Sequence, residues 1–291
     1  MIDPVVPHLL PNGQLLSRGF ACLSCGLGGD RGALAEFASL LATDARLWLP
    51  PTPNTKSPYE GRTVIHALLS DFIVPLYRDG LRLDLYRTLG GPSRCAFLFE
   101  DQAIKRDGSV YQNSPCIVLE ARGDQIASIC EYWGGPHFFA DSLQRATLQS
   151  PNPESSRIAQ AAFNDLRHGL AGDTDSLERF LGRLAPDVSL WFPPTPNTRS
   201  PYRGAAAARA LFVELLVPMY PQGLYVQLFH TLSSGSLTTF ETQSFGVRRD
   251  GSEYINTPAL TLNIRDGKIG ELWEHWGPPG AFDPELRRIS I

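Results

Sequence analysis

Four stretches of the chain space their apolar residues three and four positions apart, the pattern of a helix that buries one side. They form two pairs, residues 13–27 with 33–42, and residues 158–170 with 176–185. Asp30 and Asp173 precede the second member of each pair, where an aspartate side chain can accept a hydrogen bond from the first helical turn. The pattern predicts two helices, the second with an acidic cap, at two places in the chain.

Strand-like patterns follow each helix pair. In the first half they are residues 45–50, 81–89, 95–106, 109–122 and 125–133. A loop rich in proline separates the first of these from a third predicted helix at 62–77, and Asp107-Gly108 is a hairpin-turn signal between two later strands. Helices that precede an antiparallel meander indicate an α+β domain.

The chain repeats itself. LWLPPTPNTKSPYEG at 47–61 returns as LWFPPTPNTRSPYRG at 190–204, an offset of 143. With this offset and no gap, 39 of the 93 positions from 47 to 139 are identical in the second half. A short shared motif does not extend so far, so the sequence indicates tandem duplication of a whole domain.

The duplication sets the expected boundaries. We expect a first domain at 1–147, a linker rich in proline and serine at 148–156, and a second domain at 157–291. A chain of 291 residues, 43% hydrophobic and 19% charged, has enough apolar side chains for two cores and is unlike a disordered protein or a coiled coil.

Charge and composition exclude several partners and sites. The net charge of -4, spread without basic blocks, argues against nucleic acid. The sequence lacks a leader pattern and an apolar run of membrane-spanning length, and its five cysteines all lie in the first half, which favours reduced thiols; we therefore expect a cytoplasmic protein with no membrane partner. Motifs for metals, nucleotides and catalytic triads are missing, so we expect no metal and no cofactor.

Three segments resemble a known family. They are the helix entry Tyr59-Glu60-Gly61-Arg62, the hairpin at 107–113 and the ending at 267–276, within the order α-α-β-α-β-β-β-β. The chain resembles the SnoaL-like polyketide cyclases and the ketosteroid-isomerase group of the nuclear-transport-factor-like superfamily. The resemblance implies two cone-shaped α+β barrels, each a curved antiparallel sheet over three helices around an apolar pocket. It also implies an intramolecular pseudo-dimer that pairs through the outer sheet faces, and leaves a further homo-oligomer open.

Glu131 and Glu274 are the leading catalytic candidates. Each lies in an apolar terminal strand whose alternation places the glutamate on the face of Ile129 or Leu272. Burial raises the pKa of a carboxyl and suits a general acid or base near neutrality. The structural alternative is that each glutamate bonds an arginine or a backbone amide and holds the sheet together.

The strand after the hairpin carries a second candidate set. Tyr111 and Asn113, with Tyr254 and Asn256 in the second copy, stand two positions apart on one strand face and can donate hydrogen bonds to a carbonyl or enolate oxygen. The alternative role for these four residues is hairpin packing.

Aromatic residues and one histidine complete the expected substrate-binding set. We expect tryptophans to form flat pocket walls, a tyrosine to cover each pocket and a histidine on the third helix to reach it. They are Trp48, Trp191, Trp133, Trp276, Tyr59, Tyr202 and His66. The alternatives are core tryptophans, loop-anchoring tyrosines and a surface histidine.

The chain departs from the family at two positions. The stretches at 47–50 and 190–193 hold no counterpart of the catalytic aspartate of ketosteroid isomerases, and Cys116 and Ala259 stand near the expected place of the second acid. Steroid-isomerase chemistry is therefore not inherited. His275 adjoins Glu274 and so faces the opposite side of the sheet, which argues against a dyad of the two in one pocket.

The resemblance and the candidate residues imply a cofactor-independent enzyme of specialised metabolism. It would be a cyclase or isomerase that acts by general acid-base catalysis on a hydrophobic, oxygenated small molecule. The alternatives are a non-catalytic binding or carrier protein, an epoxide-opening hydrolase or cyclase, and a scaffold with collapsed pockets. Tandem domains also occur among polyether epoxide-opening cyclases, but their acidic pairs do not map securely onto this chain.

Overall fold

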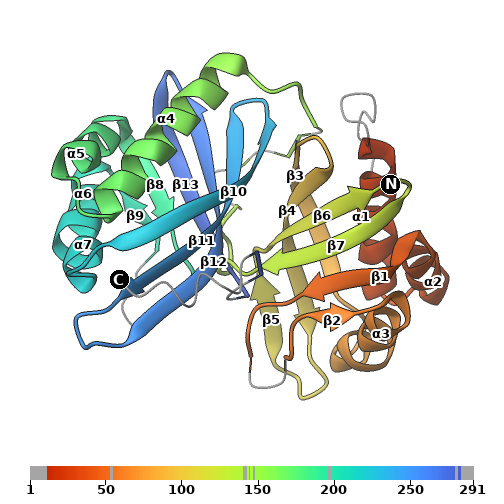
Figure 1. Ribbon diagram of the computed structural model, residues 1–291. Helices are drawn as coiled ribbons and strands as arrows, with labels where there is room; N and C mark the ends of the chain where they lie inside the picture. The colour runs from red at the N-terminus through yellow and green to blue at the C-terminus, as the bar shows by residue number, and fades with distance from the viewer. Residues whose placement is uncertain are drawn as a thin grey trace. The chain divides into compact units, whose positions relative to one another are not determined.

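The computed structural model describes residues 12–52, 55–139, 143, 145–146, 148–195, 198, 200–278 and 281–282. The chain divides into two compact units, Met1–Gln149 and Ser150–Ile291, which we call unit 1 and unit 2 (Figure 1). Helix α4 begins at Pro153, because proline suits the first helical turn and the Asn152 side chain accepts hydrogen bonds from the backbone N–H groups of Glu154 and Ser155. The last four residues of the expected linker at 148–156 are therefore helical.

Both units run from helices to strands. Unit 1 contains α1 (Gly13–Leu27), α2 (Arg31–Leu40), β1 (Leu41–Trp48), β2 (Tyr59–Glu60), α3 (Arg62–Ala67), the π-helix η2 (Leu68–Ile73), the 3₁₀-helix η3 (Val74–Leu76), β3 (Arg82–Gly90), β4 (Arg94–Ile104), β5 (Val110–Asn113), β6 (Cys116–Arg122) and β7 (Gln125–Tyr132). Unit 2 contains α4 (Pro153–Leu170), α5 (Thr174–Gly182), β8 (Leu184–Trp191), β9 (Tyr202–Arg203), α6 (Ala205–Ala210), the π-helix η4 (Leu211–Leu216), α7 (Val217–Met219), β10 (Leu224–Ser234), β11 (Leu237–Val247), β12 (Glu253–Arg265) and β13 (Lys268–Gly277). The predicted α+β class is confirmed.

Each unit orders its strands in the same way. The order is β2-β1-β7-β6-β4-β3 in unit 1, with β5 also paired to β4, and β9-β8-β13-β12-β11-β10 in unit 2. The prediction of a purely antiparallel sheet is wrong at one place, because β1 pairs with β7, and β8 with β13, in parallel. These partners lie at opposite ends of the unit's sequence, and the long connection between them allows the parallel direction.

The third predicted helix changes its winding along its length. In unit 2 the α-helical turn of α6 widens into the π-helix η4 and ends in the short α7. In unit 1, α3 widens into the π-helix η2 and ends in the 3₁₀-helix η3. Pro218 has no N–H to donate to the carbonyl of Glu214, so regular α-helical bonding is interrupted here. The predicted single helix at 62–77 is therefore three consecutive segments. Single π-turns within α-helices often mark functional sites.

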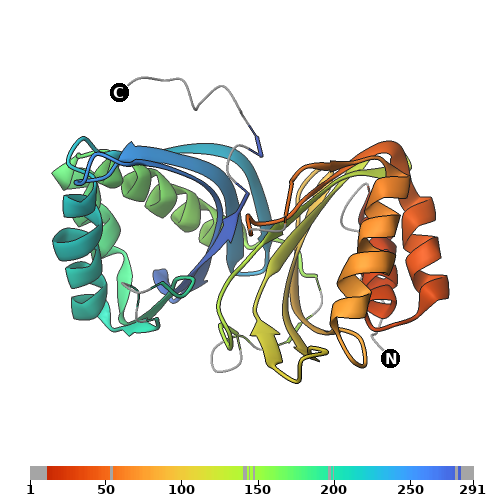
Figure 2. The ribbon, with the colours of Figure 1, turned by 90° about the horizontal axis from the view of Figure 1, so that it is seen from below.

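The helices of each unit lie on one face of its curved sheet (Figure 2). In unit 1, Phe20 of α1 stacks on Phe97 of β4 with ring centroids 4.3 Å apart. In unit 2, Phe163 of α4 stacks on Phe240 of β11 at 4.4 Å. These pairs occupy equivalent positions of the repeat, so the duplication preserves the contact that joins the first helix to the sheet.

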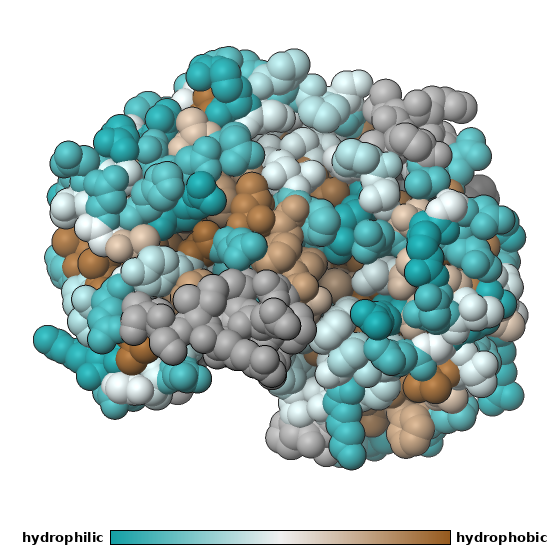
Figure 3. Space-filling view, in the orientation of Figure 1, coloured by the Kyte–Doolittle hydropathy of each residue, from teal (hydrophilic) through white to brown (hydrophobic). Residues whose placement is uncertain are grey.

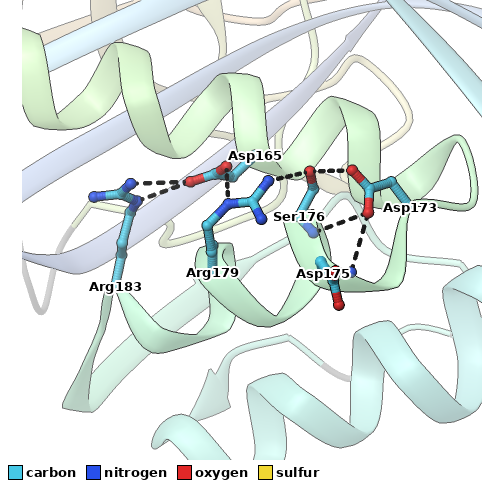
Figure 4. Close-up of polar contacts among 6 residues, drawn as sticks. All are labelled: Asp165, Asp173, Asp175, Ser176, Arg179 and Arg183. Carbon is cyan, nitrogen blue, oxygen red and sulfur yellow. Dashed lines mark hydrogen bonds and ion pairs between the residues drawn. The ribbon is translucent and has the colours of Figure 1, made fainter.

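Polar groups tie α4 to α5. The Asp165 carboxylate accepts hydrogen bonds from Arg179 Nε at 3.0 Å and from Arg183 Nη2 at 3.0 Å, while Asp173 caps α5 through the backbone N–H groups of Asp175 and Ser176 (Figure 4). Side chains over α4 are mainly hydrophilic on the face drawn in Figure 3. The acidic caps predicted at Asp30 and Asp173 are confirmed, since Asp30 accepts from the N–H of Ala33.

The five cysteines are free thiols, as predicted. Cys22 stands where unit 2 has Asp165, so one helix position serves as a buried thiol in one unit and as an ion-pair acceptor in the other. Among the described helices, none is long and apolar enough to cross a membrane.

Phe180 gives a test of the unit 2 core. Its ring is buried and meets Phe212 edge-on, with centroids 5.2 Å apart. We expect Phe180→Ala to destabilise unit 2 by about 3 to 5 kcal/mol, because truncation leaves a cavity, as measured by the midpoint of urea unfolding. Val213→Ala, at a position 37% exposed, is the control and should cost less than about 0.5 kcal/mol. Equal losses in the two variants would contradict this description of the core.

Candidate active site

Unit 2 encloses a cavity of about 690 Å³ between its helices and the inner face of its sheet. Apolar side chains from α4, η4 and the strands form most of its lining, among them Leu166, Phe212, Leu215, Leu260 and Leu272. Both the volume and the apolar lining are typical of small-molecule sites. Its polar side chains determine what chemistry the cavity can support.

Glu274 is one of these polar groups. It lies on β13 between Leu272 and Trp276, and strand alternation turns all three side chains toward the cavity, which they line. The Trp276 indole Nε1 donates a hydrogen bond to Glu274 Oε1 at 2.6 Å. The buried His275 lies between Glu274 and Trp276 on the strand and so faces the opposite side of the sheet, in agreement with the sequence argument.

Burial raises the pKa of Glu274 to about 7, and the hydrogen bond from Trp276 only partly opposes this effect. No lysine or arginine contributes to the shift. Glu274 nevertheless keeps partial solvent accessibility, since the cavity lies in front of it. The structure therefore gives no support to the alternative role of Glu274 as an ion-pair partner.

Tyr254 is a hydrogen-bond donor in the same cavity. Asn256 Nδ2 donates to the Tyr254 hydroxyl at 3.2 Å, while Asn256 Oδ1 accepts from the Thr257 N–H at 2.9 Å and so fixes the orientation of the amide. Burial, reinforced by Glu274, raises the pKa of Tyr254, which keeps its proton. Tyr254 lines the cavity and Asn256 does not, so Asn256 positions the tyrosine instead of touching a ligand.

Unit 1 holds the same frame with one added acid. Trp133 Nε1 donates to Glu131 Oε1 at 3.1 Å, and burial raises the pKa of Glu131 to about 7. The Tyr111 hydroxyl donates to Asp101 Oδ2 at 3.4 Å. Desolvation, with the Glu131 charge as a second cause, raises the pKa of Asp101 well above its ordinary value.

Asp101 was missed in the sequence. It pairs in register with Asn113, exactly as Ser244 pairs with Asn256 in unit 2, so the repeat exchanges a carboxyl for a hydroxyl at this position. Asp101 follows Phe97 and Phe99 on the face of β4 that enters the core, but Leu98 before Glu100 is equally apolar, so alternation alone does not choose between the two acids. The Tyr111 hydroxyl is engaged by a carboxyl, whereas the Tyr254 hydroxyl is not.

The tryptophans divide between two faces. Trp276 lines the unit 2 cavity, and Trp133 holds the equivalent position in unit 1. Trp191 follows Leu190, which lies in the core, so it points to the opposite face of β8 and does not line the cavity; Trp48 follows Leu47 in the same way. The expectation that Trp48 and Trp191 form pocket walls therefore disagrees with their placement.

Tyr202 does not line the unit 2 cavity, and Tyr59 bonds to its own loop. The Tyr202 ring meets Phe192 edge-on, with centroids 6.2 Å apart, and it is Phe192 that lines the cavity. The Tyr59 hydroxyl accepts a hydrogen bond from the Lys56 N–H at 3.2 Å, which anchors the preceding loop. Both tyrosines agree better with the loop-anchoring alternative.

His66 is half-buried in the last turn of α3. Its counterpart Arg209 forms an exposed ion pair with Glu178, with the two atoms Nη2 and Oε1 2.5 Å apart, and does not line the cavity of unit 2. Arg209 therefore points from α6 toward α5, which carries Glu178. His66 occupies the equivalent position of α3 in unit 1.

No protein-family model and no curated protein sequence matches the chain. Solved structures that resemble part of it include an NTF2-like protein from Anabaena variabilis, with 23% identity over 42% of this chain and 88% of that one and a TM-score of 0.39. Another is RV0760c from Mycobacterium tuberculosis in complex with estradiol-17beta-hemisuccinate, with 15% identity over 41% and 90% and a TM-score of 0.34.

A third neighbour is a protein from Catenulispora acidiphila with a ketosteroid isomerase-like fold, in complex with trimethylamine. It has 11% identity over 39% of this chain and 83% of that one, with a TM-score of 0.34. The Anabaena and Catenulispora proteins bear the fold names that the resemblance implies, and each of the three matches has about the length of one unit. The function of this chain is therefore inferred from its own cavity.

The raised pKa of Glu274 predicts that the free energy of unfolding of unit 2 depends on pH. Between pH 4.5 and about 7 the folded protein holds this proton while the unfolded chain releases it, so the contribution of Glu274 to stability falls as pH rises through that window. At pH 8 the ionised Glu274 lowers the free energy of unfolding by about 3 kcal/mol relative to the protonated form at low pH. We expect Glu274→Gln to raise the urea midpoint of unit 2 at pH 8 and to leave it nearly unchanged at pH 4.5.

Glu253→Gln, at the exposed start of β12, is the matched control and should follow the wild type at every pH. A Glu274→Gln variant that is less stable than the wild type at pH 8 would show that the carboxylate has a stabilising partner, against the environment described here.

Proposed function

We propose that unit 2 is the catalytic unit of a cofactor-independent enzyme, of cyclase or isomerase type, that acts on a hydrophobic, oxygenated small molecule. The observation that supports this best is Glu274, whose carboxyl has a pKa of about 7 and faces an apolar cavity of about 690 Å³. A group that is half ionised near neutrality can both accept and return a proton. A place in specialised metabolism is part of the same proposal.

The geometry suits proton transfer beside a carbonyl or hydroxyl oxygen. Trp276 holds Glu274 through Oε1, which leaves Oε2 as the oxygen for proton transfer. Tyr254 then donates a hydrogen bond to the oxygen on which negative charge develops. Asn256 occupies an acceptor position of the tyrosine hydroxyl, so the proton of that hydroxyl points to a bound ligand.

The comparison of the two units favours unit 2. The Tyr111 hydroxyl of unit 1 already donates to Asp101, while Ser244 replaces that acid in unit 2. The pairing of the two units through their outer sheet faces and the cytoplasmic location are predictions from the sequence that accompany this proposal.

One observation favours a second function for unit 1. Asp101 and Glu131 are two buried carboxyls with raised pKa values close to one tyrosine. A protonated acid beside an ionisable one is the pairing that epoxide opening requires, since one group protonates the ring oxygen while the other activates the nucleophile. The epoxide-opening alternative therefore belongs to unit 1.

The neutral probe 5-nitrobenzisoxazole tests Glu274 without knowledge of the substrate. Removal of its C–H proton by a carboxylate forms a nitrile, breaks the N–O bond and leaves a phenolate, which Tyr254 can stabilise. We expect turnover to rise with pH through an apparent pKa of about 7, because the ionised carboxyl is the base. Glu274→Gln should lower the rate by about 100-fold or more.

Glu253→Gln is the control for a lost surface charge, and Glu131→Gln separates the contribution of unit 1. Wild-type turnover in Glu274→Gln, with loss in Glu131→Gln, would move the catalytic role to unit 1. Absence of turnover in the wild type, with the probe bound equally by wild type and Glu274→Gln, would support the carrier alternative against the enzyme.

A further inference from the structure

Three arginines line the unit 2 cavity in addition to the groups assigned above. Arg167 comes from α4, and Arg248 and Arg249 come from the turn between β11 and β12. Within the described part of the chain, none of the three forms an ion pair with a carboxylate. Other arginines of unit 2 do so, in the pairs Arg157–Glu154, Arg179–Asp165, Arg183–Asp165, Arg209–Glu178 and Arg265–Asp187.

Arg167 has an unmet hydrogen-bonding requirement. It is half-buried on the side of α4 that carries Phe163, Leu166 and Leu170, all of which line the cavity. Its Nε is buried and has no hydrogen-bond partner among the described residues. A buried donor without an acceptor costs free energy, so this guanidinium is suited to an acceptor that arrives from the cavity.

Arg248 also presents its charge to the cavity. Its guanidinium carbon stands 4.9 Å from the centroid of the Tyr254 ring, and Nη1 donates to Ser252 Oγ at 3.3 Å. Asp250 is a carboxylate on the same lining, but its Oδ1 accepts from the Ser252 N–H at 2.9 Å and from Ser252 Oγ at 2.6 Å. Hydrogen bonds within this turn are the main cause that lowers the pKa of Asp250, and the charge of Arg248 is a smaller one.

The arginines gather at one end of the cavity. The Arg249 N–H donates to the carbonyl of Met219, which joins the β11–β12 turn to the end of α7. Gly223, in the connection from α7 to β10, packs so closely on Ala171 that an added Cβ would lie 2.8 Å from the Ala171 carbonyl oxygen. Since Ala171 follows the last turn of α4, this connection lies between the α4 end that carries Arg167 and the turn that carries Arg248.

Unit 1 lacks one of these three charges, the one on the first helix. The offset of 143 places Ser24 opposite Arg167, whereas Lys105 stands opposite Arg248 and Arg106 opposite Arg249. The shared fold therefore does not need an arginine on the first helix. A function that belongs to unit 2 alone explains the half-buried guanidinium of Arg167, with its buried Nε, at this position.

We propose that the molecule bound in unit 2 carries an anionic group, of carboxylate or sulfonate type, which Arg167 and Arg248 bind while its apolar body extends toward Glu274. Arginine suits such a group because its planar donors match two acceptor oxygens. The inference rests on the proposed function, in that both place the ligand in the same cavity, and it adds the substrate class: an apolar acid instead of a neutral ketone or alcohol.

Two fluorescent probes with one aromatic skeleton test this. 8-Anilinonaphthalene-1-sulfonate carries an anionic group, and N-phenyl-1-naphthylamine lacks it. Ser244 lines the cavity from β11, so Ser244→Trp fills the cavity with a large side chain. The binding of each probe that this variant loses is the binding that belongs to the cavity. We expect Arg167→Gln and Arg248→Gln each to weaken the sulfonate by about tenfold, and to change the affinity for the neutral probe less than twofold.

Arg157→Gln is the control, since Arg157 lies on the same helix in an exposed pair with Glu154. Unchanged affinity for the neutral probe also shows that the variants are folded. Equal affinity changes for the two probes, or no change for the sulfonate, would overturn the anionic ligand and leave the proposed function standing. If Ser244→Trp removes no binding of either probe, the wild-type cavity binds neither of them, and this result would contradict the proposed function as well.

Discussion

Exclusion of water from the space between the helices and the inner face of each sheet is the condition on which the site depends. Phenylalanine and leucine side chains from both layers close this space, and the Phe163–Phe240 stack joins its two walls. A glutamate that enters it from β13 loses hydration and gains one hydrogen bond, from Trp276. Because this single donor does not replace water, the carboxyl holds its proton up to a pH of about 7.

The duplication supplies an internal comparison. Both units keep the glutamate, the tryptophan two residues later, and the tyrosine and asparagine of the facing strand, at equivalent places. What changes is the polar surrounding: Asp101 is exchanged for Ser244, and Ser24 for Arg167. The common frame therefore accounts for a carboxyl that titrates near neutrality, while the exchanged residues give the glutamates of the two units different polar surroundings.

Local patterns predicted much of this structure. The apolar spacing located α1 to the residue, and alternation along the terminal strand placed both glutamates on the inner face. The parallel pairing of β1 with β7 joins distant segments, and nothing in the local sequence specifies its direction. The orientation of Trp48 and Trp191 was unpredictable for a related reason, since two adjacent apolar residues, such as Leu47 and Trp48, do not reveal which one enters the core.

The remaining site residues depend on the tertiary fold. Arg167 looks like an ordinary polar position in the amphipathic pattern of α4, and only the folded structure shows it at a cavity with its Nε buried. Asp101 follows an acidic neighbour, Glu100, and the choice between the two required the register of β4. Residues whose role arises from contacts between elements thus escape an argument from periodicity.

The protonation of the Glu274 carboxyl can be observed directly by titration. In protein labelled with carbon-13 at the glutamate carboxyl, nuclear magnetic resonance follows each glutamate as pH is raised. Two signals should titrate near 7, those of Glu131 and Glu274, and Glu274→Gln should remove one of them. If every glutamate signal of the wild type completes its titration below about pH 5, the unit 2 cavity does not hold a carboxyl poised for proton transfer, and Glu274 is not the general base.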